Sequence, residues 1–337
     1  NQQIALKPEM TAPVVRAFIE GGFFRSNPLC RLYYIDSLFR REKPQKGRQR
    51  QFNQFGIEAF GSSNIEQDVE VIMIAATCLK TLKINETTLH VNNIGSPETR
   101  TQYEELLKKY FTQNISSLSS LSKKRLETNP IRILDSKEKE DLSIIKNAPI
   151  IKELLTDSEK EDFNMLLSNL DTLNVKYEES PYLVRGLDYY NGTTFEITTR
   201  SNKSQNALCG GGRYDFLVEQ MGGPSTPAIG FAAGMERMII ESQYQVEKNS
   251  IDIYISSNDL NHSRKCFTIM QNLIDNNYTV FFDTNKKNVK NQMKDATKRN
   301  ASYLLIIDKN ITVKNIKSND EIAVSDFHEL LNFLKNQ

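Results

Sequence analysis

The sequence predicts an α+β fold in which helices flank an antiparallel sheet, a helical insertion interrupts the sheet, and a separate α/β domain follows it. Three observations support this prediction. Two strand-like runs, 34–40 and 50–60, are joined by a short basic connection, as in a hairpin. Residues 97–179 are charged and helical in pattern, and strands and helices alternate after residue 247. We therefore expect four segments: a first core part (1–96), the insertion (97–179), a second core part (180–248) and the last domain (249–337).

In the first half of the chain, periodicity and turn residues define each element. Residues 11–24 favour a helix, with Thr11 as a candidate cap. After the hairpin, 66–82 is amphipathic and 88–92 favours a strand. In the insertion, Ser158 and Glu161 form a capping-box pattern.

The second half begins with strand-like residues and glycine-rich turns. Residues 183–190 favour a strand, Asn191-Gly192 is a hairpin-turn signal, and 224–237 leads into a helix near Gly234. In the last domain we expect strands at 251–255, 278–282, 303–307, 311–313 and 321–324, and helices at 266–274, 289–298 and 327–334.

Composition excludes several classes of protein. With 337 residues the chain can bury two or three separate cores, and its 39% hydrophobic and 25% charged residues are ordinary for a globular protein. The longest apolar runs, such as 304–307, are too short to cross a bilayer, so we expect no membrane partner. The first residues lack a secretory pattern, and we expect a cytoplasmic protein or, if a leader has been lost, an organellar one.

Cysteines and histidines are too scattered to suggest a metal site. The four cysteines contain no C-x-x-C pair, and the three histidines lie far apart. We therefore expect no disulfide framework and no metal held by protein ligands. The net charge is only +1, so a nucleic acid would have to bind local basic patches, such as 43–50 and 286–299.

The returning strand of the hairpin carries residues suited to a binding pocket. With a period of two, its face presents Phe52, Gln54, Gly56 and Glu58. The connection beside that face is crowded with cations: Arg40, Lys43, Lys46, Arg48 and Arg50. This arrangement suits a polyanion lying over the hairpin, and a solvated charged hairpin is the alternative.

Three arginines are expected near this pocket: Arg40, Arg185 in L-V-R-G-L-D-Y-Y, and Arg237 in G-F-A-A-G-M-E-R. A guanidinium can grip phosphate oxygens at two points and stays charged at any working pH. Activation of a carboxylic acid with ATP requires such groups, because the α-phosphate must be neutralised while the acid is held in line. Taken singly, each arginine would more simply form a surface salt bridge.

Five segments together resemble signatures of the histidyl-tRNA synthetases, a family of class II aminoacyl-tRNA synthetases. The hairpin (39–58), with F-R-R-E-K-P-Q-K-G-R and R-Q-F-N-Q-F-G-I-E, is similar to the second class II motif, and 230–237 is similar to the third. L-V-R-G-L-D-Y-Y-N, C-G-G-G-R-Y-D and L-K-P-E-M-T-A resemble signatures of the family itself. Lys43, Lys7 and Met10 depart from the pattern. The last domain resembles the family's anticodon-binding domain.

The resemblance implies an ATP site and a catalytic cation. ATP would contact Arg40, Glu42, Arg48, Phe52 and Arg237. Arg40 would bind the α-phosphate and Arg237 the γ-phosphate, with adenine between Phe52 and the Arg237 side chain. Arg185 would polarise the α-phosphate during catalysis together with Arg40, and Mg²⁺ would arrive with ATP through its phosphates.

The resemblance also implies a pocket for L-histidine. Its residues would be Glu9, Thr11, Gln54, Glu58, Tyr189, Tyr190 and Tyr214. Glu9, Thr11 and Gln54 would receive the α-amino group, while Glu58 and Tyr190 would address the two imidazole nitrogens. Tyr189 and Tyr214 would line the cavity or serve only as packing aromatics.

Histidine tRNA and a second copy of the chain are the implied macromolecular partners. The tRNA acceptor end would meet Lys43, Gln45, Lys46 and Arg50, with Gln45 as the reader of its extra base pair. Family members carry an N-terminal segment that contains the first class II motif and builds the dimer interface. We expect a homodimer of the full-length protein and impaired activity without that segment.

The implied activity is activation of L-histidine to histidyl-adenylate and transfer to the 3′ end of histidine tRNA. One alternative is the non-catalytic, synthetase-like regulatory subunit of histidine biosynthesis, which would lack adenylation residues and the terminal domain. Another is an amino-acid ligase of the same catalytic fold, which would lack the basic loop and the anticodon module. The sequence contains these features, which favours the synthetase.

Overall fold

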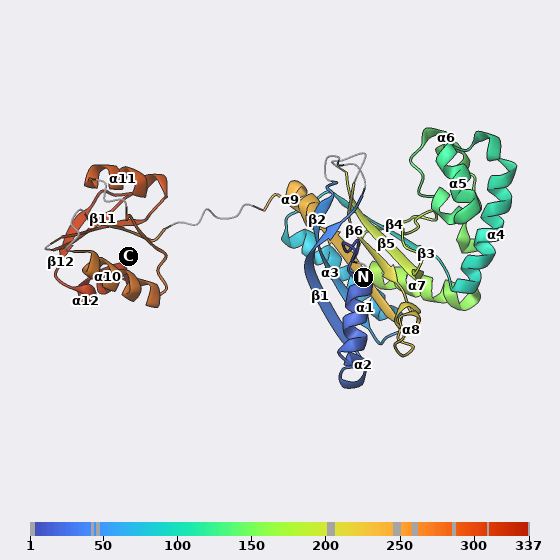
Figure 1. Ribbon diagram of the computed structural model, residues 1–337, viewed down its shortest axis with the longest axis horizontal. Coiled ribbons are helices and arrows are strands. Elements are labelled where there is room, and N and C mark those ends of the chain that lie inside the picture. The colour runs from blue at the N-terminus through green and yellow to red at the C-terminus, as the bar shows by residue number, and fades with distance from the viewer. Residues whose placement is uncertain are drawn as a thin grey trace. The chain divides into compact units, whose positions relative to one another are not determined.

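The computed structural model describes residues 4–41, 44, 48–200, 206–244, 251–257, 262–284, 288–308 and 310–335. It divides into two compact units, Asn1–Tyr244 and Gln245–Gln337 (Figure 1). The division of the first unit into core and insertion segments stays a prediction.

A seven-stranded sheet forms the centre of the first unit, with the strand order β1-β2-β7-β6-β5-β3-β4. All neighbouring strands are antiparallel except β3 and β4, which are parallel. The strands are β1 (Cys30–Phe39), β2 (Gln51–Phe60), β3 (Thr87–Asn93), β4 (Tyr177–Glu179), β5 (Asn191–Thr199), β6 (Ala207–Arg213) and β7 (Ala228–Gly234). The predicted hairpin is therefore β1 and β2, and the predicted α+β fold is confirmed.

Apolar cores lie on both faces of this sheet. On one face, α3 (Ile65–Thr81) and α7 (Asp157–Thr172) bury Ile72 and Leu166 against Phe195 and Phe231. On the other face, α1 (Thr11–Glu20), α2 (Phe23–Ser26) and α8 (Leu217–Gln220) contribute to a core in which Phe18 stacks on Phe60 at 4.3 Å. The short helix α9 (Met235–Glu241) follows β7 directly.

Helices occupy the region between β3 and β4, as expected for the insertion. They are α4 (Pro97–Gln113), η1 (Ile115–Ser117), α5 (Ser120–Thr128), η2 (Pro130–Ile133), α6 (Lys139–Ile145), η3 (Ile151–Glu153) and then α7. Figure 1 shows α4, α5 and α6 grouped at one side of the unit. Asp141 joins α6 to the start of α5 and to the segment before α6. Its buried carboxylate accepts hydrogen bonds from the hydroxyls of Ser119, Ser122 and Ser136.

Four local predictions are wrong. Residues 183–190 form no strand, and Asn191-Gly192 begins β5 instead of a hairpin turn; the Asn191 side chain is bonded to Asp215, and a register shift follows at the positive φ of Gly192. The capping box of α7 uses Thr156 and Glu159, because the helix begins two residues earlier than expected. Thr11 is the first residue of α1 and not its cap.

The second unit is a small α/β domain, as the alternating pattern predicted. Its sheet has the order β12-β11-β10-β8-β9, with β8 (Ile253–Ser256) parallel to β9 (Val280–Phe282) and β10 (Tyr303–Ile307). Antiparallel strands β11 (Ile311–Asn315) and β12 (Glu321–Val324) complete it. Helices α10 (Ser263–Asp275) and α12 (Phe327–Lys335) share one core with the sheet, and α11 (Val289–Lys298) belongs to a second. Among the described helices, none combines the length and apolar character that a membrane span requires.

Candidate active site

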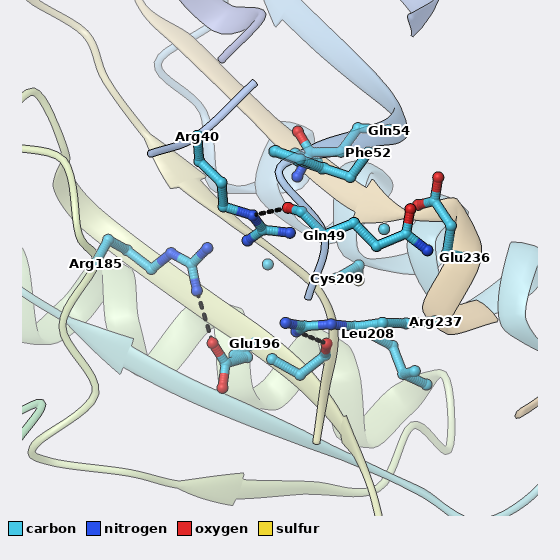
Figure 2. Close-up of a pocket in the computed structure, with 14 residues that line it drawn as sticks. Arg40, Gln49, Phe52, Gln54, Arg185, Glu196, Leu208, Cys209, Glu236 and Arg237 are labelled. Carbon is cyan, nitrogen blue, oxygen red and sulfur yellow. Dashed lines mark hydrogen bonds and ion pairs between the residues drawn. The ribbon is translucent and has the colours of Figure 1, made fainter. Parts of the chain in front are cut away.

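The three predicted arginines line one pocket. Arg40 follows β1, Arg185 lies in the irregular segment before β5, and Arg237 lies on α9. Figure 2 shows their guanidinium groups approaching the same space from different sides. The remaining lining residues are Gln49, Phe52, Gln54, Glu196, Ala207, Leu208, Cys209, Gly210, Ala232, Gly234 and Glu236. The pocket floor comes from β2, β7 and β6, which are adjacent strands in the sheet.

Each guanidinium is oriented by a specific neighbour. The Nε of Arg40 donates to the Gln49 carbonyl at 2.7 Å, and its guanidinium lies 3.9 Å from the centre of the Phe52 ring. Arg185 donates from Nη1 to Glu196 at 2.9 Å, and Arg237 donates to the Ala207 carbonyl at 2.7 Å. Arg40 therefore covers a face of the ring on which the resemblance places adenine.

Positive charge gathers at this pocket. Burial, and after it the neighbouring Arg48 cation, lowers the pKa of Arg237. The Nε of Arg185 is buried and has no hydrogen-bond partner among the described residues. An anion in the pocket would relieve the repulsion and satisfy this donor.

Glycine makes room for the catalytic cation. A Cβ at position 210 would lie 2.7 Å from the Cζ of Arg185, closer than real Cβ atoms approach other atoms. The guanidinium can therefore rest on β6 only because residue 210 has no side chain. Gly210 also pairs with Glu196 across β5 and β6, so the cation and its carboxylate partner share one row of the sheet.

A buried acidic cluster adjoins the arginine pocket along β2. Glu58 is 1% exposed; the Thr11 hydroxyl donates to its Oε1 at 2.8 Å and the Tyr214 hydroxyl donates to its Oε2. Burial raises the pKa of Glu58 to about 8, although both hydrogen bonds favour the ionised form. A Cβ on Gly230, which faces Glu58 in the register, would overlap the carboxylate.

The other residues predicted to bind the substrate histidine surround this cluster. The Tyr189 ring is tilted against the Tyr190 ring, with ring centres 4.7 Å apart, and forms an edge-to-face contact with the Tyr214 ring at 5.7 Å. Gln54 lines the arginine pocket and lies two residues after Phe52, on the same face of β2. Glu9 accepts the Ala12 amide at 3.2 Å and so caps α1. The structure thus brings together Thr11, Glu58 and the three tyrosines as one cluster, with Glu9 at its edge.

Sequence reasoning missed a set of residues that hold the cluster in place. Arg213 is 6% exposed; it pairs with fully buried Asp68 and donates to Asp215 at 3.0 Å. Asp215 in turn exchanges hydrogen bonds with Asn191 and accepts the Ala228 amide at 2.9 Å. These bonds join the starts of β5 and β7 to the end of β6, directly beside the tyrosines. We call Arg213, Asp68, Asp215 and Asn191 the clamp. The R-Y-D part of C-G-G-G-R-Y-D, which contains Arg213 and Asp215, is the sequence feature that could have indicated it.

Two acidic side chains of the pocket were also missed. Glu196 pairs with Arg185, and Glu236 accepts hydrogen bonds from the backbone and side-chain amides of Asn53 at 2.9 and 2.8 Å. Glu236 thereby joins α9 to β2. The predicted site residues Glu42, Lys43, Gln45 and Lys46 lie outside the described residues, and Arg50 is exposed.

A mainly antiparallel sheet that carries three convergent arginines beside a buried acidic cluster defines a class II aminoacyl-tRNA synthetase. Residues 1–238 match the sequence profile of the histidyl-tRNA synthetase family. The chain belongs to that family.

Individual relatives agree with this assignment. The chain is 42% identical to the chloroplastic histidine–tRNA ligase of Gracilaria tenuistipitata var. liui, over 94% of this chain and 77% of the relative. It is 40% identical to the histidine–tRNA ligase of Clostridium novyi, over 96% and 80%. The structure is similar to that of apo S. aureus histidyl-tRNA synthetase, with a TM-score of 0.78 and 31% identity over 98% of this chain and 82% of the other.

A fourth likeness concerns the fold alone. A protein from Bacillus halodurans C described as an ATP phosphoribosyltransferase regulatory subunit/histidyl-tRNA synthetase shares a TM-score of 0.61 at 20% identity, over 89% of this chain and 79% of that protein. The fold is therefore shared by proteins described with the regulatory alternative, and the side chains of the pocket have to decide between the two functions.

Proposed function

We propose that this protein activates L-histidine with ATP, forming histidyl-adenylate and pyrophosphate, and transfers the histidyl group to the 3′ end of histidine tRNA. The observation that carries this proposal is the convergence of Arg40, Arg185 and Arg237 on one pocket. The regulatory alternative predicts loss of these adenylation residues. Their presence in one pocket favours the catalytic function.

The arginine pocket fits a nucleotide triphosphate. Arg40 and Arg185 both line the pocket and are proposed to hold the α-phosphate, while Arg237 and Arg48 are proposed to hold the γ-phosphate. Phosphate oxygens would accept a hydrogen bond from the buried Nε of Arg185. They would also reduce the repulsion between the positive charges of Arg48 and Arg237. Mg²⁺ is proposed to enter with ATP, bound mainly through the phosphates.

Adenine binding on Phe52 requires a rearrangement of Arg40. In the structure the Arg40 guanidinium lies over this ring. We infer that Arg40 turns from the ring toward the α-phosphate when ATP binds, which exposes the ring for the base. The contact between the Phe52 ring and the guanidinium is worth only about 0.5–1 kcal/mol, so phosphate binding can replace it.

The acidic cluster is proposed to hold the imidazole of histidine. Glu58 is proposed to accept a hydrogen bond from one imidazole N–H. The Tyr190 hydroxyl is proposed to bind the other imidazole nitrogen. The α-amino group is proposed to bind Gln54, Thr11 and Glu9. The histidine carboxylate then attacks the α-phosphorus and pyrophosphate leaves. Polar groups of a buried site reject analogues that cannot pair with them, which supplies specificity.

Contacts with tRNA, homodimer formation and a location in the cytoplasm or an organelle remain part of this proposal. The acceptor end is proposed to meet Arg50 and the neighbouring residues Lys43, Gln45 and Lys46, and the second unit to bind the anticodon. Pyrophosphate exchange with each of the twenty amino acids tests the central reaction. We expect exchange with histidine; exchange stimulated by another amino acid and not by histidine would overturn the assigned specificity.

A further inference from the structure

A tyrosine outside the predicted site has a buried hydroxyl without a partner. Tyr34, on β1, is 7% exposed, and its hydroxyl makes no hydrogen bond to any residue that the structure describes. A buried polar group left unpaired destabilises a folded protein, and native structures pair nearly all such groups. Phenylalanine would fill the same space without this penalty. The hydroxyl therefore indicates a ligand that would pair with it.

The surroundings of Tyr34 place this hydroxyl in the acidic cluster. The pKa of Tyr34 is raised first by burial and then by Glu58, Tyr190 and Glu9. The phenol therefore stays protonated and can both donate and accept a hydrogen bond. All three of these neighbours belong to the proposed histidine pocket.

The sheet register shows where the hydroxyl points. Tyr34 faces Gly56 across β1 and β2, Gly56 faces Ala232, and Ala232 faces Gly210. A Cβ on Gly56 would overlap the Tyr34 hydroxyl, so the hydroxyl lies directly over that glycine. Arg185 lies in the same way over Gly210, at the other end of the row.

This row has the dimensions of an amino-acid site. Gly56 and Gly210 are separated by two strand spacings, about 10 Å, and only the small Ala232 lies between them. One end presents a phosphate-binding cation, Arg185. The other end presents the Tyr34 hydroxyl, in the row next to Glu58. The carboxylate of the substrate histidine reacts at the phosphate and therefore belongs at the Arg185 end. The imidazole side chain of the substrate then belongs at the Tyr34 end.

We propose that the Tyr34 hydroxyl hydrogen-bonds the imidazole of the substrate and is a specificity-determining contact in addition to Glu58. This inference rests on the function proposed above. The Tyr34 hydroxyl makes no hydrogen bond within the part of the protein that the structure describes. The Tyr214 hydroxyl differs, because it donates a hydrogen bond to Glu58.

The test is Tyr34→Phe in the full chain, with Tyr110→Phe as a matched control. The control loses the same atom from the insertion, where the Tyr110 hydroxyl donates to the Ile144 carbonyl at 2.9 Å. In pyrophosphate exchange, Tyr34→Phe should raise the KM for histidine about 3- to 10-fold and leave the KM for ATP unchanged. Its melting temperature should equal or exceed that of the wild type, whereas Tyr110→Phe should lower the melting temperature and keep both KM values.

A substrate analogue identifies the contacted group. Binding of β-(2-thienyl)alanine, whose ring lacks an N–H, should change less than about twofold between wild type and Tyr34→Phe, because no hydrogen bond is lost. An unchanged KM for histidine, an equal loss for both amino acids, or a lower melting temperature in Tyr34→Phe would each overturn the inference. A wild type without histidine-dependent exchange would instead overturn the proposed function.

Discussion

Glu58→Gln should make the protein more stable at neutral and alkaline pH. Burial raises the pKa of Glu58 from 4.5 to about 8. Between these two pH values the folded protein holds a proton on Glu58 that the unfolded chain has lost, so the free energy of unfolding falls as the pH rises through this window. The full effect is at most about 5 kcal/mol, since each tenfold change in proton affinity is worth about 1.4 kcal/mol. Glutamine has nearly the same shape and does not titrate.

The assay is urea unfolding of wild type and Glu58→Gln at pH 5, 7 and 9. The chain contains no tryptophan, and far-UV circular dichroism is therefore the suitable signal. We expect similar stabilities near pH 5 and an advantage for Glu58→Gln that grows to pH 9. Glu70→Gln is the control, because Glu70 forms an exposed pair with Arg31 and should show little change. Parallel stability curves for wild type and Glu58→Gln would refute the argument that Glu58 is protonated in the folded protein.

Three further substitutions test the pocket and its support. Arg185→Ala should lower histidine-dependent pyrophosphate exchange by about 10²- to 10³-fold while calorimetry still detects histidine binding, because the cation acts on the developing charge; unchanged turnover would remove it from the mechanism. Gly210→Ala should lower the same rate by about 100-fold, since the new methyl displaces the Arg185 guanidinium, and an unaffected rate would show that the guanidinium has room. Asp68→Asn should lower the free energy of unfolding by about 3 kcal/mol in urea, because Arg213 stays buried without its main carboxylate, and a loss below about 1 kcal/mol would match an exposed pair and contradict the clamp.

The hairpin could be predicted from the sequence because its information is local. Alternation with a period of two placed Phe52, Gln54 and Glu58 on one face, and the structure places these residues on one face of β2. The alternating elements of the second unit were predicted for the same reason. Each of these elements is formed by residues close in sequence.

The segment before β5 shows where local reasoning fails. Residues 183–190 have the composition of a strand, but long-range hydrogen bonds hold the chain as a loop. The Asn92 side chain donates to the carbonyls of Pro181 and Leu183, and Arg132 donates to that of Gly186. These partners are 54 to 91 residues away, and no local pattern reveals them.

The convergence of the arginines was likewise not readable from periodicity or spacing. Arg40 and Arg237 are brought together because β2 pairs with β7, and Arg185 joins them because β6 lies next to β7. Only the resemblance to a known family implied that the three arginines bind one nucleotide, and the order of strands came from the structure. The pairing of Arg213 with Asp68, which the R-Y-D sequence does not specify, and the unpaired hydroxyl of Tyr34 required the three-dimensional structure.

A crystal structure with histidine and a non-hydrolysable ATP analogue tests the central claim most directly. We predict that the α-phosphate lies within hydrogen-bond distance of both Arg40 and Arg185 and that the imidazole meets Glu58. An α-phosphate bound away from these two arginines, or an imidazole bound outside the Glu58 cluster, would contradict the account.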